Sequence, residues 1–124
     1  MTQQKLELDH GMMVSFLKKP GADIIASLTP ETMDMLHMAV GVSGEAGELL
    51  DAVKKASVYN KPIDRENVVE ELGDLEFYME GLRQTAGITR EETLIHNMKK
   101  LNKRYSAGYS DAAAQARVDK PEGQ

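Results

Sequence analysis

Four carboxylates stand in two closely spaced pairs in the middle of the chain. Glu45 and Glu48 form the first pair, and Glu71 and Asp74 form the second. Residues three apart in an α-helix lie on one face, so each pair presents two carboxylates side by side. Two such helices packed antiparallel would bring all four together, where they repel one another unless a divalent cation lies between them. Because carboxylate oxygens suit Mg²⁺ or Mn²⁺, the spacing predicts a metal site.

Each pair also has a simpler interpretation. Glu-x-x-Glu alone is typical of a solvated helical surface, and a lone Glu such as Glu71 is usually exposed or paired with a Lys. Two observations favour the metal. Glu71 falls at the edge of an apolar stripe, where an ionised carboxylate needs a compensating partner. Gly41, Gly44 and Gly47 surround the first pair and suggest space kept open for close backbone approach.

Composition limits the remaining possibilities. The chain has 124 residues, a formal net charge of −5, eight Met, no Cys and no Trp, which fits one helical domain better than a sheet. Without Cys there are no disulfides, zinc-thiolate sites or thiol nucleophiles. The negative charge argues against a nucleic-acid partner. No apolar run is long enough to span a membrane and no signal-peptide pattern opens the chain, so we expect a cytoplasmic protein without a membrane partner.

Capping signals and apolar periodicity predict four main helices, over residues 4–18, 30–57, 65–86 and 90–105. The first is interrupted or weakened at Gly11. Residues 22–28 form either one short turn of helix or a cover for the core, residues 110–118 a short docked helix, and residues 119–124 a loose end. The inward-facing residues are predicted to be Leu6, Met13, Phe16, Leu17, Leu36, Ala39, Val40, Leu50, Val53, Val68, Leu72, Leu75, Met79, Leu82, Ala86, Leu94, Ile95, Met98 and Leu101.

The two acidic pairs occur in the contexts V-S-G-E-A-G-E-L and V-E-E-L-G-D-L-E-F-Y, and residues 97–105 read N-x-x-K-L-x-x-R-Y. Together these motifs resemble the all-α nucleoside triphosphate pyrophosphohydrolases of the MazG-like group, including small phage-encoded members. The resemblance covers roughly residues 30–119. It implies an all-α, four-helix-bundle-like fold that is oligomeric, with helices packed across the subunit interface. We expect a single domain over residues 1–105 and a partly docked tail over residues 106–124.

The resemblance also implies an activity and its residues. Members hydrolyse the α–β bond of nucleoside triphosphates to a monophosphate and pyrophosphate, with Mg²⁺ held by the positions that correspond to Glu45, Glu48, Glu71 and Asp74. We hypothesise that Glu45 or Glu48 orients the attacking water or takes its proton. Relatives assemble as dimers or as dimers of dimers, which a chain with so few aromatic residues and such long apolar stripes would also need.

Several residues are candidates for binding the nucleotide. Tyr78 matches a position that contacts the nucleotide in some relatives, whereas the Trp on which some members stack the base is absent here. Lys54, Lys100 and Arg104 are candidates for holding phosphates, and Asn97 belongs to the same motif as the last two. Cations late in a helix also favour its C-terminal dipole, so a purely structural role stays open.

Two other functions compete with this hypothesis. A phosphoribosyl-ATP pyrophosphohydrolase uses a similar helical scaffold and would act on phosphoribosyl-ATP but not on free nucleotides. A non-catalytic helical module would carry the same acidic faces merely solvated or bound to a partner protein. The absence of any Mg²⁺ effect on melting, together with no nucleotide turnover, would favour the second alternative.

Overall fold

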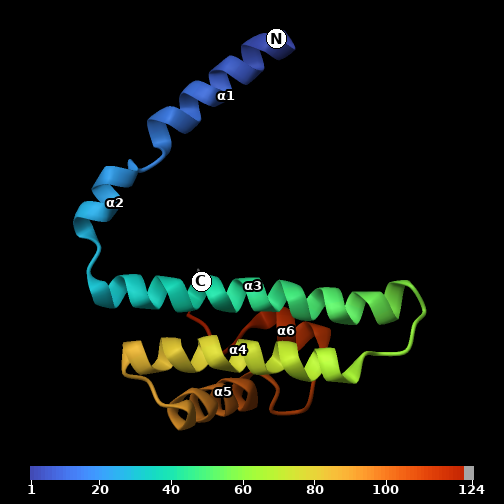
Figure 1. Cartoon of the computed structure of the whole chain (residues 1–124). Coiled ribbons are helices and arrows are strands. Elements are labelled where there is room, and N and C mark those ends of the chain that lie inside the picture. Colours follow the sequence, from blue (N-terminus) through green and yellow to red (C-terminus); the bar gives the residue numbers. More distant parts are fainter. Residues whose placement is uncertain (122–124) are drawn as a thin grey trace. The chain divides into compact units, whose positions relative to one another are not determined.

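The computed structural model describes residues 1–121 and is built from helices (Figure 1). No strand occurs among the described residues, which confirms the all-α prediction. The chain divides into two compact units, Met1–Met33 and the part from Asp34 onward. In chain order the helices are α1 (Gln3–Leu17), α2 (Gly21–Ser27), α3 (Pro30–Val58), α4 (Arg65–Ala86), α5 (Arg90–Arg104) and α6 (Asp111–Ala116).

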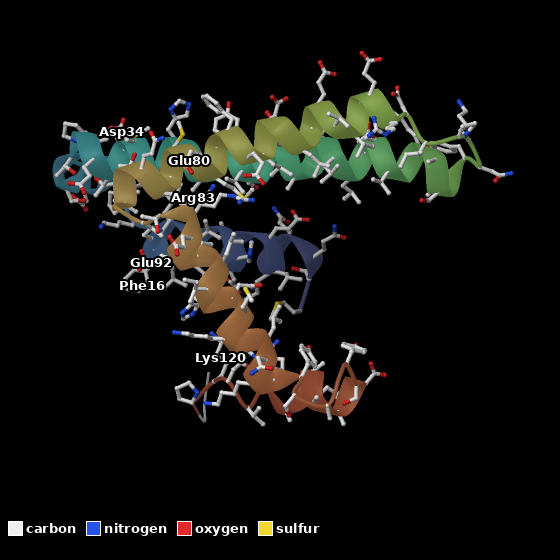
Figure 2. All side chains as sticks on the ribbon, turned by 90° about the horizontal axis from the view of Figure 1, so that it is seen from below. Phe16, Asp34, Glu80, Arg83, Glu92 and Lys120 are labelled. Carbon is white, nitrogen blue, oxygen red and sulfur yellow. The ribbon has the colours of Figure 1, made fainter. Side chains whose placement is uncertain are left out.

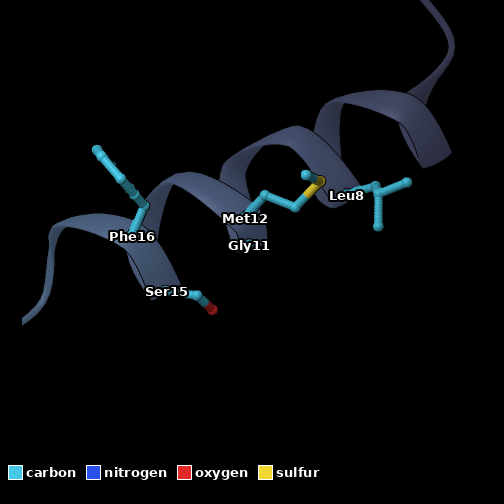
Figure 3. A pocket seen from close by; sticks show the side chains of 5 residues that line it. All are labelled: Leu8, Gly11, Met12, Ser15 and Phe16. Atoms are coloured by element: carbon cyan, nitrogen blue, oxygen red, sulfur yellow. The ribbon is translucent and has the colours of Figure 1, made fainter. Parts of the chain in front are cut away.

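The first unit consists of α1, α2 and the first turn of α3. Helix α1 continues through Gly11, so the predicted interruption there is wrong. Residues 22–28 were predicted to form either one short turn of helix or a cover for the core, and most of them belong to the short helix α2. Phe16 of α1 is 87% exposed, and it lines an open hollow on one side of the helix with Leu8, Met12 and Ser15 (Figure 3). The apolar residues predicted to be core in this helix are therefore exposed.

The predicted helix starts in the middle of the chain are confirmed by their caps. Thr29 accepts a hydrogen bond from the Thr32 N–H at 3.1 Å. Asp64 caps α4 in the same way at 3.1 Å, and Thr89 caps α5 at 3.0 Å. Each cap satisfies one of the N–H groups that the first turn of a helix leaves unpaired. Helix α4 ends at Gly87, whose φ of 70° is the left-handed conformation that glycine adopts without strain.

Helices α3 and α4 lie side by side and antiparallel (Figure 1). A Cβ on Gly41 of α3 would overlap the ring of Tyr78 on α4, and a Cβ on Gly81 of α4 would overlap the side chain of Met38. These glycines therefore allow two bulky side chains to pack directly against the opposite helix. The two contacts follow one another by about one turn along each helix, and they fix which residues lie opposite each other.

Burial within this single chain is slight. Ala52, which is 5% exposed, is the one buried residue among residues 1–121. The apolar stripe of α4 is half-buried at Val68, Leu75, Met79 and Leu82. Most other predicted core residues remain exposed, including Leu50 at 67% and Met98 at 70%. The stripes predicted to face inward are therefore largely uncovered within one chain.

The C-terminal part is held against the end of α5. The rings of Tyr105 and Tyr109 lie 5.5 Å apart, and the Ser110 hydroxyl caps α6 by accepting from the Ala113 N–H at 3.1 Å. The predicted short helix is thus present but shorter. Asp119, expected in the loose end, is instead paired with Arg104, while residues 122–124 lie outside the described residues. No described helix combines the length and apolar character needed to cross a membrane.

Candidate metal and nucleotide site

Three carboxylates from two helices converge on one point. Glu45 on α3 and Glu71 and Asp74 on α4 each place an oxygen within 4.8 Å of the other two. The register set by the Gly41–Tyr78 contact explains this arrangement, because Glu45 follows Gly41 and Asp74 precedes Tyr78 by about one turn. Glu45 and Glu71 are half-buried and Asp74 is exposed. The antiparallel packing predicted from the sequence therefore brings both acidic pairs into contact through these three members.

Within residues 1–121, no ion pair compensates the charge of this cluster. Burial raises the pKa of Glu71, and the neighbouring charges of Glu45, Glu48 and Asp74 raise it further. A side-chain hydrogen bond between Glu71 and Glu45 acts in the same direction. The ionised cluster is thus electrostatically unfavourable by itself, which is the condition that a bound cation would relieve.

Glu48 lies at the edge of this group. It is exposed and is not among the three converging residues, although its charge contributes to the raised pKa of Glu71. The structure therefore brings together three of the four predicted ligands and leaves the fourth nearby. A direct metal-ligand role for Glu48 stays a prediction.

Tyr78 lies one turn beyond Asp74 on α4. Its half-buried ring packs over Gly41 and meets the rings of Phe77 and His37 edge-on, with centroids 5.1 Å and 6.4 Å away. Of the three glycines expected to allow a close approach, Gly41 does so. A Cβ on Gly44 or Gly47 would meet nothing within 4 Å.

The predicted phosphate contacts lie on two helices, α3 and α5. Lys54 is exposed on α3, where its charge helps Lys55 to lower the pKa of Asp51. Asn97 is exposed on α5 and Lys100 is half-buried on the same helix. Neither lysine forms an ion pair with Glu45, Glu71 or Asp74 among the described residues.

Arg104 is already engaged within the chain. Its Nε and Nη2 donate to the two carboxylate oxygens of Asp119 at 2.6 Å and 3.0 Å. Hydrogen bonds from Arg104 hold the pKa of Asp119 below its ordinary value. The sequence does not predict this pair, because Asp119 lies beyond α6, at no spacing that a helix or a turn would bring to Arg104.

The MazG nucleotide pyrophosphohydrolase domain matches residues 33–108. The chain belongs to the MazG family. The matched region contains both acidic pairs and the predicted motif on α5, which confirms the family predicted from these motifs. No curated protein and no solved structure matches the chain.

For a MazG protein, the acidic cluster fits a hard divalent cation. Its ligands are carboxylate oxygens contributed by two helices, and they converge without a protein cation to neutralise them. Helices α1, α2 and α6 lie outside the matched residues. The cluster therefore belongs to the MazG domain itself and not to the segments that flank it.

Proposed function

We propose that this MazG protein hydrolyses nucleoside triphosphates at the α–β bond and releases a nucleoside monophosphate and pyrophosphate. The observation that carries the proposal is the uncompensated cluster of Glu45, Glu71 and Asp74, which concentrates negative charge at one point. A triphosphate is itself anionic, so such a cluster attracts it only through a shared cation. Family membership supports a nucleotide pyrophosphohydrolase in general, and the cluster supports a metal-dependent one.

Glu45, Glu71 and Asp74 are the proposed metal ligands, with Glu48 as a fourth. When bound, Mg²⁺, or Mn²⁺ in its place, supplies charge neutralisation at the phosphate oxygens and lowers the pKa of coordinated water. Glu48 stands at the edge of the cluster and is exposed, so it is the carboxylate best placed to accept a proton from the attacking water. Water adds to phosphorus as the bridging oxygen leaves with the pyrophosphate.

Binding of the nucleotide requires residues beyond the acidic cluster. Tyr78 adjoins it on α4 and offers a ring face or edge to the nucleotide. Lys54, Asn97, Lys100 and Arg104 remain proposed contacts for the phosphates. Arg104 can contact a phosphate only if its side chain shares or releases Asp119, because its Nε and Nη2 both donate to that carboxylate.

We infer that the active form is a homo-oligomer, a dimer or a dimer of dimers. The support is the exposed apolar surface of a chain in which Ala52 alone is buried among the described residues. A symmetric contact between helices would remove such surface from water. Sedimentation analysis should show at least a dimer, and a compact monomer at the concentrations used for activity would contradict the inference.

The test of the activity is a panel of canonical and modified ribonucleoside and deoxyribonucleoside triphosphates with Mg²⁺, scored for pyrophosphate release. Glu71→Gln should lower kcat/KM by at least about a hundredfold, since it removes a metal ligand. Glu70→Gln is the matched control, because it makes the same change at the neighbouring, exposed position of α4. Equal rates in the two variants would contradict the proposal.

The same panel separates the competing functions. Turnover of phosphoribosyl-ATP without turnover of any free nucleotide would select the histidine-pathway type of activity. No turnover, combined with no effect of Mg²⁺ on the melting temperature, would indicate a non-catalytic helical module. Circular dichroism of both variants checks that helix content is unchanged.

A further inference from the structure

A hollow lined mainly by lysines lies along α5 and the segment that follows α6. It has a volume of about 280 Å³. The side chains that line it are His96, Lys99, Lys100, Lys103, Asp119 and Lys120. Lys120 reaches this place from outside the helix, next to the lower end of α5 (Figure 2). The hollow shares no lining residue with the acidic cluster on α3 and α4.

The four lysines that line this hollow have no ion-pair partner within residues 1–121. Asp119 is the acidic residue of the lining, but its carboxylate is only 4% exposed and accepts both of its short hydrogen bonds from Arg104. The hollow therefore presents a net positive charge in a chain whose formal charge is −5.

The fold holds this arrangement in place. Helix-dipole effects account for a cation in the last turn of α5, such as Lys103, but not for Lys120, which belongs to a separate segment. The Arg104–Asp119 pair ties that segment to α5, and the Lys120 N–H donates to the Arg117 carbonyl at 2.9 Å. The structure thus brings a fourth ammonium beside three that already follow one helix.

We propose that this hollow binds a linear polyphosphate group without a metal ion, at a place other than the acidic cluster. Lysine ammoniums are mobile point charges with three donors each, and they suit the successive oxygens of a phosphate chain. The limited volume favours one short chain over a nucleic-acid strand. The ligand is either an inorganic polyphosphate or the phosphate tail of a nucleotide.

This inference goes beyond the proposed hydrolysis and does not depend on it. Lys100 is shared with the proposed substrate contacts, whereas Lys99, Lys103 and Lys120 are assigned no role there. Lys120 also lies outside the residues matched by the MazG domain. In EDTA the acidic cluster has no cation and repels an anion, so it does not contribute to the binding then measured.

Titration calorimetry with inorganic triphosphate in EDTA at low salt tests the proposal. The triple variant K99Q/K103Q/K120Q should bind about tenfold more weakly than the unmodified protein, because it loses three exposed charge interactions. The matched control is K5Q/K18Q/K19Q, which removes the same charge from exposed lysines of the first unit. It should retain the affinity, and circular dichroism should show equal helix content in all three proteins.

Two further ligands identify the source of the phosphate chain. A nucleoside triphosphate that binds as tightly as inorganic triphosphate, or more tightly, supports recognition of a nucleotide tail, and one that binds more weakly supports a free polyphosphate. Equal affinity of the triple variant and the unmodified protein would overturn the proposal, as would an equal loss in the control. A single-stranded oligonucleotide that binds this hollow more tightly than triphosphate would overturn it in favour of nucleic acid.

Discussion

Two carboxylates with restricted exposure, Glu71 and Asp119, differ in what surrounds them. Glu71 faces other acids, and its burial and their charges raise its pKa. Asp119 faces Arg104, whose hydrogen bonds lower its pKa. The same functional group is thus destabilised as an anion in one region and stabilised in the other. An internally paired carboxylate serves the fold, whereas a converging unpaired group is suited to a cation from solution.

The largest effect on stability is expected at Asp119. Asp119→Asn removes the anion from Arg104, whose side chain is only 15% exposed, and should give the largest fall in melting temperature among these variants. Metal binding at the acidic cluster should be unchanged. Thermal melts at fixed protein concentration, together with metal titration, measure both. An unchanged melting temperature would mean that the Arg104–Asp119 pair does not stabilise the fold, which would contradict the contrast with Glu71.

The pH dependence of that effect has a definite sign. Because the pKa of folded Asp119 lies below its ordinary value of 3.8, its ionised form contributes stability above pH 3.8. This contribution is lost as the pH falls through the lower, folded pKa. The difference in melting temperature between unmodified protein and Asp119→Asn should therefore be constant near neutral pH and shrink below about pH 3.8. A difference that grows on acidification would contradict the pairing.

An intermediate effect is expected where α3 and α4 touch beside the acidic cluster. Gly41→Ala adds a methyl group that would overlap the Tyr78 ring, and it should lower the free energy of unfolding by about 1–3 kcal/mol. Gly44→Ala, one turn along the same helix, meets no atom within 4 Å and should raise it by about 1 kcal/mol. Denaturant unfolding of both variants measures the difference. Equal destabilisation would show that Gly44 also faces a close neighbour, as it would in a subunit contact.

The smallest effect on stability should have the opposite sign to that at Asp119. In EDTA, Glu71→Gln removes one charge from a group of repelling anions and should raise the melting temperature slightly. Mg²⁺ should stabilise the unmodified protein by binding the folded state, and this increment should be absent in the variant. Glu70→Gln should keep the Mg²⁺ increment. A fall in the melting temperature of Glu71→Gln in EDTA would mean that Glu71 is already compensated.

The sequence predicted local features of the fold better than its packing. Caps at Thr29, Asp64 and Thr89 depend on a few neighbouring residues, and the structure confirms all three. The apolar stripes could also be recognised from their periodicity. Periodicity indicates that a helix face packs against another surface, but it does not show whether that surface belongs to the same chain or to another copy. Residues such as Leu50 and Met98 accordingly remain exposed in one copy.

For the candidate site too, the sequence predicted local spacing better than the directions and partners of side chains. Spacing placed Glu71 and Asp74 on one face, and the antiparallel packing of the two helices brings them to Glu45. The position of Glu48 at the edge depends on side-chain direction, which spacing does not specify. The pairing of Arg104 with Asp119 depends on the path of the chain around α6, for which the sequence offers no periodic signal.

Binding of Mn²⁺, followed by electron paramagnetic resonance and displaced by Mg²⁺, tests the central claim most directly. The unmodified protein and the Glu70→Gln control should bind the ion, and Glu71→Gln should lose most of that binding. Asp119→Asn should retain it, since its carboxylate serves Arg104. Equal Mn²⁺ binding by Glu71→Gln and Glu70→Gln would contradict the assignment of this cluster as the metal site.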